Sequence, residues 1–261
     1  MTENTMTEST MTENNIYSAY DAFARVMSED WGPRCVKAKL PNVKKLLLKH
    51  IPQNSSILDI CCGTGELAEN LQNQGYQVTG LDGSSELLHY ARNKAPQSKF
   101  ILEDARYFKL PASFNGVICT NFGFNHITEL EDLTLTFKNV YEALLPGGLF
   151  VFDLRLDECY RGSWNGDILG DASDEQGWTL IRFYNQETKI GNIYITIYNP
   201  VDNSWKRSEL NWFVKGYGLQ EVTSALKEAG FTDINHYQAG TGMLFNRLSG
   251  KAGEYYFVTK K

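Results

Sequence analysis

Short apolar runs alternate with amphipathic stretches through the middle of the chain. The amphipathic stretches place apolar residues at helical spacing near 65–74, 84–94 and 130–144. The apolar runs, which we interpret as strands, span residues 57–61, 78–81, 99–102, 116–120 and 149–152. Strands that alternate with helices are typical of a parallel sheet joined by helical crossovers.

The pattern changes after Asp153. Residues 179–217 alternate apolar and polar side chains over three runs that are separated by turn-forming residues, which predicts an antiparallel meander. A helix near 218–229 and two more strands, 231–237 and 254–259, complete the chain. Because we find no Pro-rich linker, we expect residues 160–217 to be an insertion, a lid, within one domain that spans 16–261.

The N-terminal part has a different composition. Residues 1–15 repeat a five-residue unit of Met, Thr, Glu and small polar residues, which cannot bury enough apolar area to offset the entropy of ordering, so we expect a disordered tail. Apolar residues at helical spacing predict a helical segment over 16–52, and Pro41 fits the start of a helix within it.

Charge and cysteine content narrow the class of protein. Of 261 residues, 31 are acidic and 25 are Lys or Arg, and the resulting net charge of −6 argues against a broad grip on nucleic acid. The five cysteines form no CxxC pair, which predicts reduced thiols and a cytoplasmic protein rather than a disulfide scaffold or a zinc site. No apolar run approaches the roughly 20 residues that cross a bilayer.

A glycine turn follows the first predicted strand. The strand stops near Asp59, the turn runs from Cys61 to Gly65, and a helix begins at Glu66. Glycine lets the backbone adopt unusual dihedrals and lets a ligand approach closely. Asp82 closes the second strand 17 positions after Gly65, where a carboxylate can accept the hydroxyl protons of a ribose. The turn therefore predicts a nucleoside site.

Two ligands that contain a nucleoside, NAD and S-adenosylmethionine, could occupy this turn. Residues 63–68 match the loose dinucleotide pattern GxGxxA, which favours NAD. Asp59 would repel a pyrophosphate, however, and it would attract the ammonium group of S-adenosylmethionine. An NAD-dependent oxidoreductase is therefore the alternative.

The sequence resembles the class I S-adenosylmethionine-dependent methyltransferases over about residues 56–153. The resemblance rests on five segments in the order of that family: "LDICCGTGELAENL", "VTGLDGSSELLHYAR", "FILEDARYF", "FNGVICTNFGFNHI" and "LLPGGLFVFDL". Cys61 stands where the family usually has the first glycine of its loop. The implied fold is a doubly wound, Rossmann-like α/β domain with a mostly parallel seven-stranded sheet, an antiparallel last strand and the β insertion after the fifth strand.

The resemblance also implies a set of donor-binding residues. They are Asp59, Cys61, Gly63 and Gly65 at the methionine end, Asp82 and Gly83 at the ribose, Asp104 and Ala105 at the adenine, and Asn121 and Phe122 beside the donor. No metal is expected. Asp104 taken alone also fits a helix N-cap.

A weaker likeness points to the sugar-amine N-methyltransferases of macrolide biosynthesis. It rests on a tyrosine-bearing N-terminal helix, "YSAYDAF" with Tyr17 and Tyr20, and on His126 just past the fourth strand. Histidine, with an ordinary pKa near 6.5, can accept a proton from an acceptor. We therefore hypothesise that His126 orients or deprotonates the acceptor and that Tyr17 or Tyr20 assists. Tyr17 and Tyr20 share a helix face and could also close over the donor, so we include Tyr20 among the donor-binding residues. The alternatives are an ordinary loop histidine and tyrosines that pack on the sheet.

These observations favour a methyltransferase that acts on a small molecule, with an amine acceptor slightly ahead of a hydroxyl. No Asn-Pro-Pro-aromatic motif follows the fourth strand, which argues against a nucleic-acid base as acceptor. A noncatalytic protein that binds S-adenosylmethionine as a sensor or subunit is the alternative. Asp153 ends the fifth strand, where it could meet the acceptor or form an ion pair with Arg155.

Overall fold

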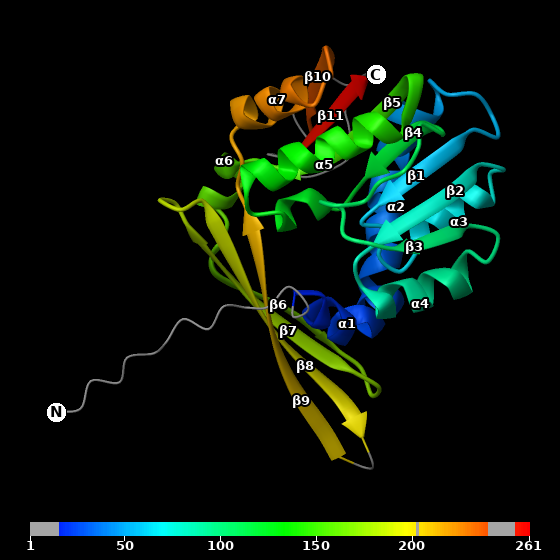
Figure 1. Ribbon diagram of the computed structural model, residues 1–261. Coiled ribbons are helices and arrows are strands. Elements are labelled where there is room, and N and C mark those ends of the chain that lie inside the picture. The colour runs from blue at the N-terminus through cyan, green and yellow to red at the C-terminus, as the bar shows by residue number, and fades with distance from the viewer. Residues whose placement is uncertain (1–15, 202–203, 240–253) are drawn as a thin grey trace.

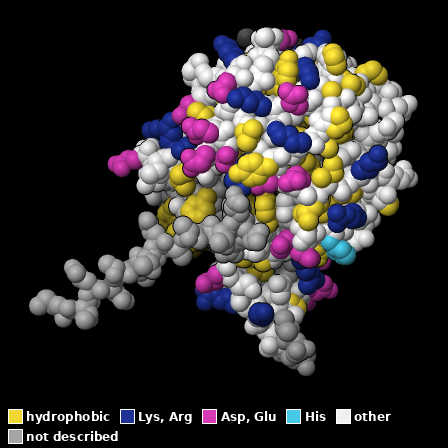
Figure 2. All heavy atoms as spheres, viewed as in Figure 1, with side chains coloured by type: hydrophobic (Ala, Val, Ile, Leu, Met, Phe, Trp, Pro, Cys, Tyr) yellow, Lys and Arg dark blue, Asp and Glu magenta, His cyan; other side chains and the backbone are white. Residues whose placement is uncertain are grey.

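The computed structural model describes residues 16–201, 204–239 and 254–261. The tail predicted for residues 1–15 lies outside these ranges. In the described part, no helix is both long and apolar enough to span a membrane. On the face seen in Figure 2, basic and acidic side chains are interspersed.

A seven-stranded sheet forms the body of the molecule (Figure 1). Its strand order is β10-β11-β5-β4-β1-β2-β3. The strands are β1 (Ser56–Ile60), β2 (Gln77–Asp82), β3 (Lys99–Leu102), β4 (Phe114–Cys119), β5 (Leu144–Arg155), β10 (Asp233–Gln238) and β11 (Glu254–Lys260). β1 to β5 pair in parallel, whereas β11 is antiparallel to both of its neighbours. The predicted fold class is confirmed.

Helices cover both faces of this sheet. Leu58 and Val117 face the layer of α5 (Leu130–Ala143) and α7 (Leu219–Glu228). Their sequence neighbours Ile57 and Ile118 face α3 (Glu66–Gln72) and the N-terminal helices. α4 (Ser85–Lys94) packs beside α3. This alternation is the period of two that a strand buried on both faces requires.

A second sheet follows β5 and the short helix α6 (Asp157–Arg161). It is antiparallel, and its strands in order are β6 (Asn165–Ala172), β7 (Gly177–Asn185), β8 (Ile190–Val201) and β9 (Ser204–Lys215). The sequence pattern predicts three runs here, which is one too few. β6 is not predicted, because most of its side chains are exposed and its apolar residues do not alternate with polar ones.

Helical backbone runs without a break from Ile16 to Leu48. The segments are α1 (Ile16–Val26), η2 (Met27–Trp31), α2 (Gly32–Val43) and η3 (Lys44–Leu48), of which η2 and η3 are π-helical. The prediction that Pro41 starts a helix is wrong, because Pro41 lies inside α2. The helix continues past it since Asn42, Val43 and Leu47 are buried against the sheet, and packing outweighs the lost hydrogen-bond donor.

α1 joins the two sheets. Phe23 and Val26 belong to one apolar cluster with Trp178 and Trp212 of the four-stranded sheet. On the opposite side, Asp21 accepts hydrogen bonds from the Ser84 hydroxyl and the Glu86 backbone at the start of α4. Figure 1 shows α1 between α4 and the four-stranded sheet, on the side of the larger sheet where β1 and β2 end.

Candidate functional site

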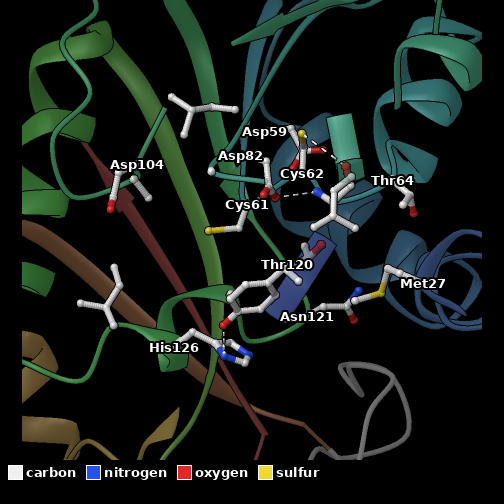
Figure 3. A pocket seen from close by; sticks show the side chains of 18 of the residues that line it. Met27, Asp59, Cys61, Cys62, Thr64, Asp82, Asp104, Thr120, Asn121 and His126 are labelled. Carbon is white, nitrogen blue, oxygen red and sulfur yellow. Dashed lines mark hydrogen bonds between the residues drawn. The ribbon is translucent and has the colours of Figure 1, made fainter. Parts of the chain in front are cut away.

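A cavity of about 310 Å³ lies at the carboxyl ends of β1, β2 and β4, and residues of α1 also line it. Figure 3 shows part of its lining. Of the residues predicted for the site, it is lined by Tyr17, Tyr20, Asp59, Cys61, Gly63, Asp82, Gly83, Asp104, Ala105, Asn121 and His126. Gly65 and Phe122 are predicted site residues that do not line it. The described part of the chain holds no group of three His, Cys, Asp or Glu side chains that could bind a metal.

The glycine turn uses its two glycines differently. Gly63 has φ +56°, and a Cβ built on it would meet no atom within 4 Å, so open cavity lies above the backbone there. Gly65 has φ +83°, and its Cβ would approach the Ala91 backbone to 2.8 Å. Gly63 therefore provides space for a ligand, whereas Gly65 allows α4 to pack against the turn.

Cys61 occupies a conformation that usually belongs to glycine. Its φ is +56°, which for a residue with a Cβ costs about 1–2 kcal/mol. Its thiol is hydrogen bonded to that of Cys119, and both sulfur atoms lie close to Gly123. Cys61, which replaces the glycine that is usual in the family, is thus strained, because it keeps the left-handed backbone conformation that glycine adopts easily.

Asp82 is fixed by the backbone of two turns. Its Oδ2 accepts the Gly63 N–H at 2.9 Å, and its Oδ1 accepts the Ser84 N–H at 3.0 Å. Burial raises the pKa of Asp82, although these two hydrogen bonds oppose that rise. The Gly83 backbone also donates to Asp82, so three of the roughly four acceptor positions of the carboxylate are used and one stays open to a ribose hydroxyl.

Asp59 is a buried carboxyl with an unsatisfied oxygen. It is 2 % exposed, and its Oδ2 has no hydrogen-bond partner. Burial, together with the negative charges of Asp82 and Glu66, raises its pKa to about 8. An orphaned acceptor in such a place is costly unless a ligand satisfies it, and a cationic group does so best. The site therefore fits the ammonium end of S-adenosylmethionine.

Asp104 has a partner that the sequence analysis missed. The Arg106 guanidinium donates to Asp104 Oδ2 at 2.7 Å, and the Arg106 backbone donates to its Oδ1 at 2.8 Å. Burial raises the pKa of Asp104, but the hydrogen bonds from Arg106 outweigh it and the net shift is downward. The signal was present as a basic residue two positions after the carboxylate. Tyr17 is also hydrogen bonded to Asp104, and its ring covers Gly83.

Tyr20 and His126 meet from distant parts of the chain. Tyr20 Oη lies 2.7 Å from His126 Nδ1, and the Tyr20 ring stacks on Trp212 at 4.9 Å (Figure 3 shows the hydrogen bond). Burial lowers the pKa of His126 to about 4, against the hydrogen bond with the Phe213 backbone. His126 is therefore neutral at pH 7. Its pKa lies below the ordinary value near 6.5 on which the hypothesis of a proton acceptor rests.

The segment after β4 is anchored by charges below the cavity. Asp153 accepts the N–H groups of Asn121 and Phe122, and it pairs with the Lys39 ammonium at 3.0 Å. The expected ion pair with Arg155 is absent, because Arg155 instead faces Glu254 at 3.5 Å. Phe122 packs between the Lys39 and Arg155 cations, 4.1 and 4.2 Å from its ring centre, which explains why it leaves the cavity.

Comparisons with known proteins agree with this geometry. A methyltransferase domain family matches residues 57–148. "Putative methyltransferase YqeM" of Bacillus subtilis is 34% identical over 189 residues, which cover 69% of this chain and 75% of the relative. The chain belongs to the class I S-adenosylmethionine-dependent methyltransferases. A methyltransferase of this class uses S-adenosylmethionine as methyl donor, and the orphaned Asp59 and the space above Gly63 fit that molecule.

Other relatives of this methyltransferase are named for amino sugars. The dTDP-3-amino-3,4,6-trideoxy-alpha-D-glucopyranose N,N-dimethyltransferase of Streptomyces venezuelae is 25% identical over 187 residues, 69% of this chain and 75% of the relative. The crystal structure of the sugar N-methyltransferase KedS8 from Streptoalloteichus has a TM-score of 0.74 and covers 100% of this chain and 99% of its own, at 17% identity. The latter likeness shows the shared fold.

Proposed function

We propose that this methyltransferase transfers a methyl group to the nitrogen of a small-molecule amine. The names of its sugar N,N-dimethyltransferase relatives support an amine acceptor. S-adenosylmethionine supplies an electrophilic methyl group on a positively charged sulfur. The tasks of the chain are to bind that donor, to align the acceptor nitrogen behind the methyl group, and to exclude water.

The donor is assigned to the carboxylates at the strand ends. Asp59 would accept from the ammonium group, Asp82 from the ribose hydroxyls and Asp104 from the adenine amine. Each of these side chains lines the cavity, and Asp59 Oδ2 has no hydrogen-bond partner within the protein. Tyr17, which covers Gly83 and contacts Asp104, would close over the nucleoside.

The low pKa of His126 and its hydrogen bonds favour an amine over a hydroxyl as the methyl acceptor. A hydroxyl acceptor needs a base that takes its proton during attack. His126 has a pKa of about 4, its Nδ1 faces the Tyr20 hydroxyl, and its ring is also hydrogen bonded to the Phe213 backbone. It is therefore a weak base whose ring already has two partners within the protein. An unprotonated amine presents its own lone pair and needs no such base. These contacts favour the hypothesis that His126 orients the acceptor through Tyr20.

Matched acceptor pairs test this proposal. The full-length protein is incubated with methyl-labelled S-adenosylmethionine and with amino sugars, each paired with the sugar that has a hydroxyl in place of the amine. We expect label in the amine of a pair and none in its hydroxyl twin. His126→Ala should lower turnover, and its unchanged turnover would remove His126 from the mechanism. Label in the hydroxyl compound would establish an O-methyltransferase, and tight donor binding without any transfer would indicate a sensor.

A further inference from the structure

Asp153 is a buried carboxylate for which the proposed chemistry has no direct use. It ends β5, is 0 % exposed, and does not line the cavity. The charged groups around it are Lys39, at 3.0 Å, and Glu254, which holds the same ammonium at 3.1 Å from the other side. This arrangement fixes the carboxylate rigidly beneath the segment that follows β4.

That segment has an uncommon backbone. Asn121 and Phe122 are consecutive residues with φ of +63° and +62°, a left-handed conformation that is unfavourable for Phe122, whereas Asn adopts it more readily. Their N–H groups donate to the two oxygens of Asp153, at 3.3 Å and 2.7 Å respectively. Hydrogen bonds to a charged group are stronger than those between neutral groups, so these two bonds offset strain in the turn. Asp153 is thus the group that stabilises this turn.

The direction of the N–H groups determines where the carbonyl groups point. All peptide bonds of the described residues are trans, and in a trans peptide the C=O points opposite to the N–H. Because the N–H groups of Asn121 and Phe122 face Asp153, the carbonyl oxygens of Thr120 and Asn121 face away from it. Thr120 and Asn121 line the cavity, as does Lys39, whereas Asp153 and Phe122 do not, and this agrees with carbonyl groups that point to the cavity.

We propose that Asp153 is a positioning residue that turns the Thr120 and Asn121 carbonyl oxygens toward the sulfonium end of the donor. Carbonyl dipoles attract a positive charge, and this attraction is stronger in a buried site than in water. The inference rests on the donor position proposed above. It predicts that the turn distinguishes S-adenosylmethionine, which carries the charge, from S-adenosylhomocysteine, which does not.

Calorimetry with both ligands tests this inference. In Asp153→Asn, we expect the affinity for S-adenosylmethionine to fall roughly tenfold relative to that for S-adenosylhomocysteine, as expected for the loss of one charge-assisted interaction. Glu254→Gln is the matched control, because it takes a carboxylate from the same Lys39 but leaves the N–H groups of the turn bound. The affinity ratio in this control should stay near that of the parent. An unchanged ratio in Asp153→Asn, or an equal change in both variants, would overturn the inference.

A measurement on the parent protein decides the matter where Asp153→Asn does not fold. A carbonyl polarised by a cation withdraws electron density from the nitrogen of its own peptide, so the amide resonances of Asn121 and Phe122 should shift more with S-adenosylmethionine than with S-adenosylhomocysteine. Equal shifts contradict the role of the turn while leaving the proposed function intact. Failure of the parent to bind either ligand would instead remove the proposed function together with this inference.

Discussion

The seven-stranded sheet and the four-stranded sheet contribute to the site in different ways. In the larger sheet, the carboxyl groups that face the cavity lie at or just after the ends of β1, β2 and β3, as Asp59, Asp82 and Asp104. The smaller sheet acts from within a strand: Trp212 stacks on Tyr20, and the Phe213 backbone bonds to His126. One sheet would bind the donor, and the other holds the residues that close over it.

The difference follows from how each group is placed. A side chain at the end of a parallel strand is brought to the ligand edge by the order of the elements alone. Tyr20 and His126 are 106 positions apart, and their contact depends on packing between α1, the loop after β4 and β9. We therefore expect the first group to be sensitive to local chemistry and the second to the packing of the four-stranded sheet.

The largest effect is expected from Trp212→Ala. Trp212 is 5 % exposed and packs on Tyr20, Phe23 and His126, so its loss should lower the free energy of unfolding by about 3–5 kcal/mol. Denaturant unfolding measures this change. Trp205, on the same strand, is 52 % exposed, and Trp205→Ala should change stability by less than about 0.5 kcal/mol. Similar losses in both variants would contradict the role assigned to the buried contact.

The difference between local patterns and long-range packing also explains which parts of the fold and the site could be predicted from the sequence. The strands and helices from β1 to β5 were predictable because each has the apolar period of its own structure, and the carboxylates at Asp59 and Asp82 follow from those strand ends. β6 was not predictable, since its exposed side chains carry no period. Lys39 pairs with Asp153 across 114 positions, and no local pattern indicates such a contact.

The second effect concerns the donor side. Asp59→Asn removes the negative charge that we assign to the donor's ammonium group, and we expect the affinity for S-adenosylhomocysteine to fall by about 2–3 kcal/mol, the value of a hydrogen bond to a charged group. Calorimetry measures it. The control is Asp167→Asn in the four-stranded sheet, where the carboxylate pairs with Arg182 away from the cavity. An equal loss of affinity in the control would place the donor elsewhere.

The pKa of Asp59 predicts how donor affinity depends on pH. The pKa of Asp59 is about 8, so at pH 6 or 7 the carboxyl is protonated and must lose its proton to bind an ammonium group. Affinity for S-adenosylhomocysteine should therefore rise with pH, by up to about tenfold per unit, until it levels off near the pKa. Below pH 8, binding should release a proton, which calorimetry in buffers of different ionisation enthalpy detects.

The raised pKa of Asp59 also predicts how the stability of the protein depends on pH. A folded pKa of about 8, far above the unfolded value near 3.9, means that the folded state retains a proton that the unfolded state loses. The contribution of Asp59 to stability is therefore fully present below about pH 4 and is lost as the pH rises toward 8. Asp59→Asn should remove this loss. A donor affinity that is flat from pH 6 to 8 in the parent would contradict the raised pKa.

The smallest effect is expected at the strained residue of the donor turn. Cys61 has φ +56°, and Gly and Ala at this position differ mainly in whether a Cβ must adopt that conformation. Cys61→Gly should therefore be more stable to denaturant than Cys61→Ala by about 1–2 kcal/mol, even though glycine is normally the less stabilising residue. Both variants remove the thiol that contacts Cys119, so that loss cancels in the comparison. If Cys61→Ala were the more stable variant, the turn would not require the left-handed conformation, and the sequence pattern that identified the donor site would lose its physical basis.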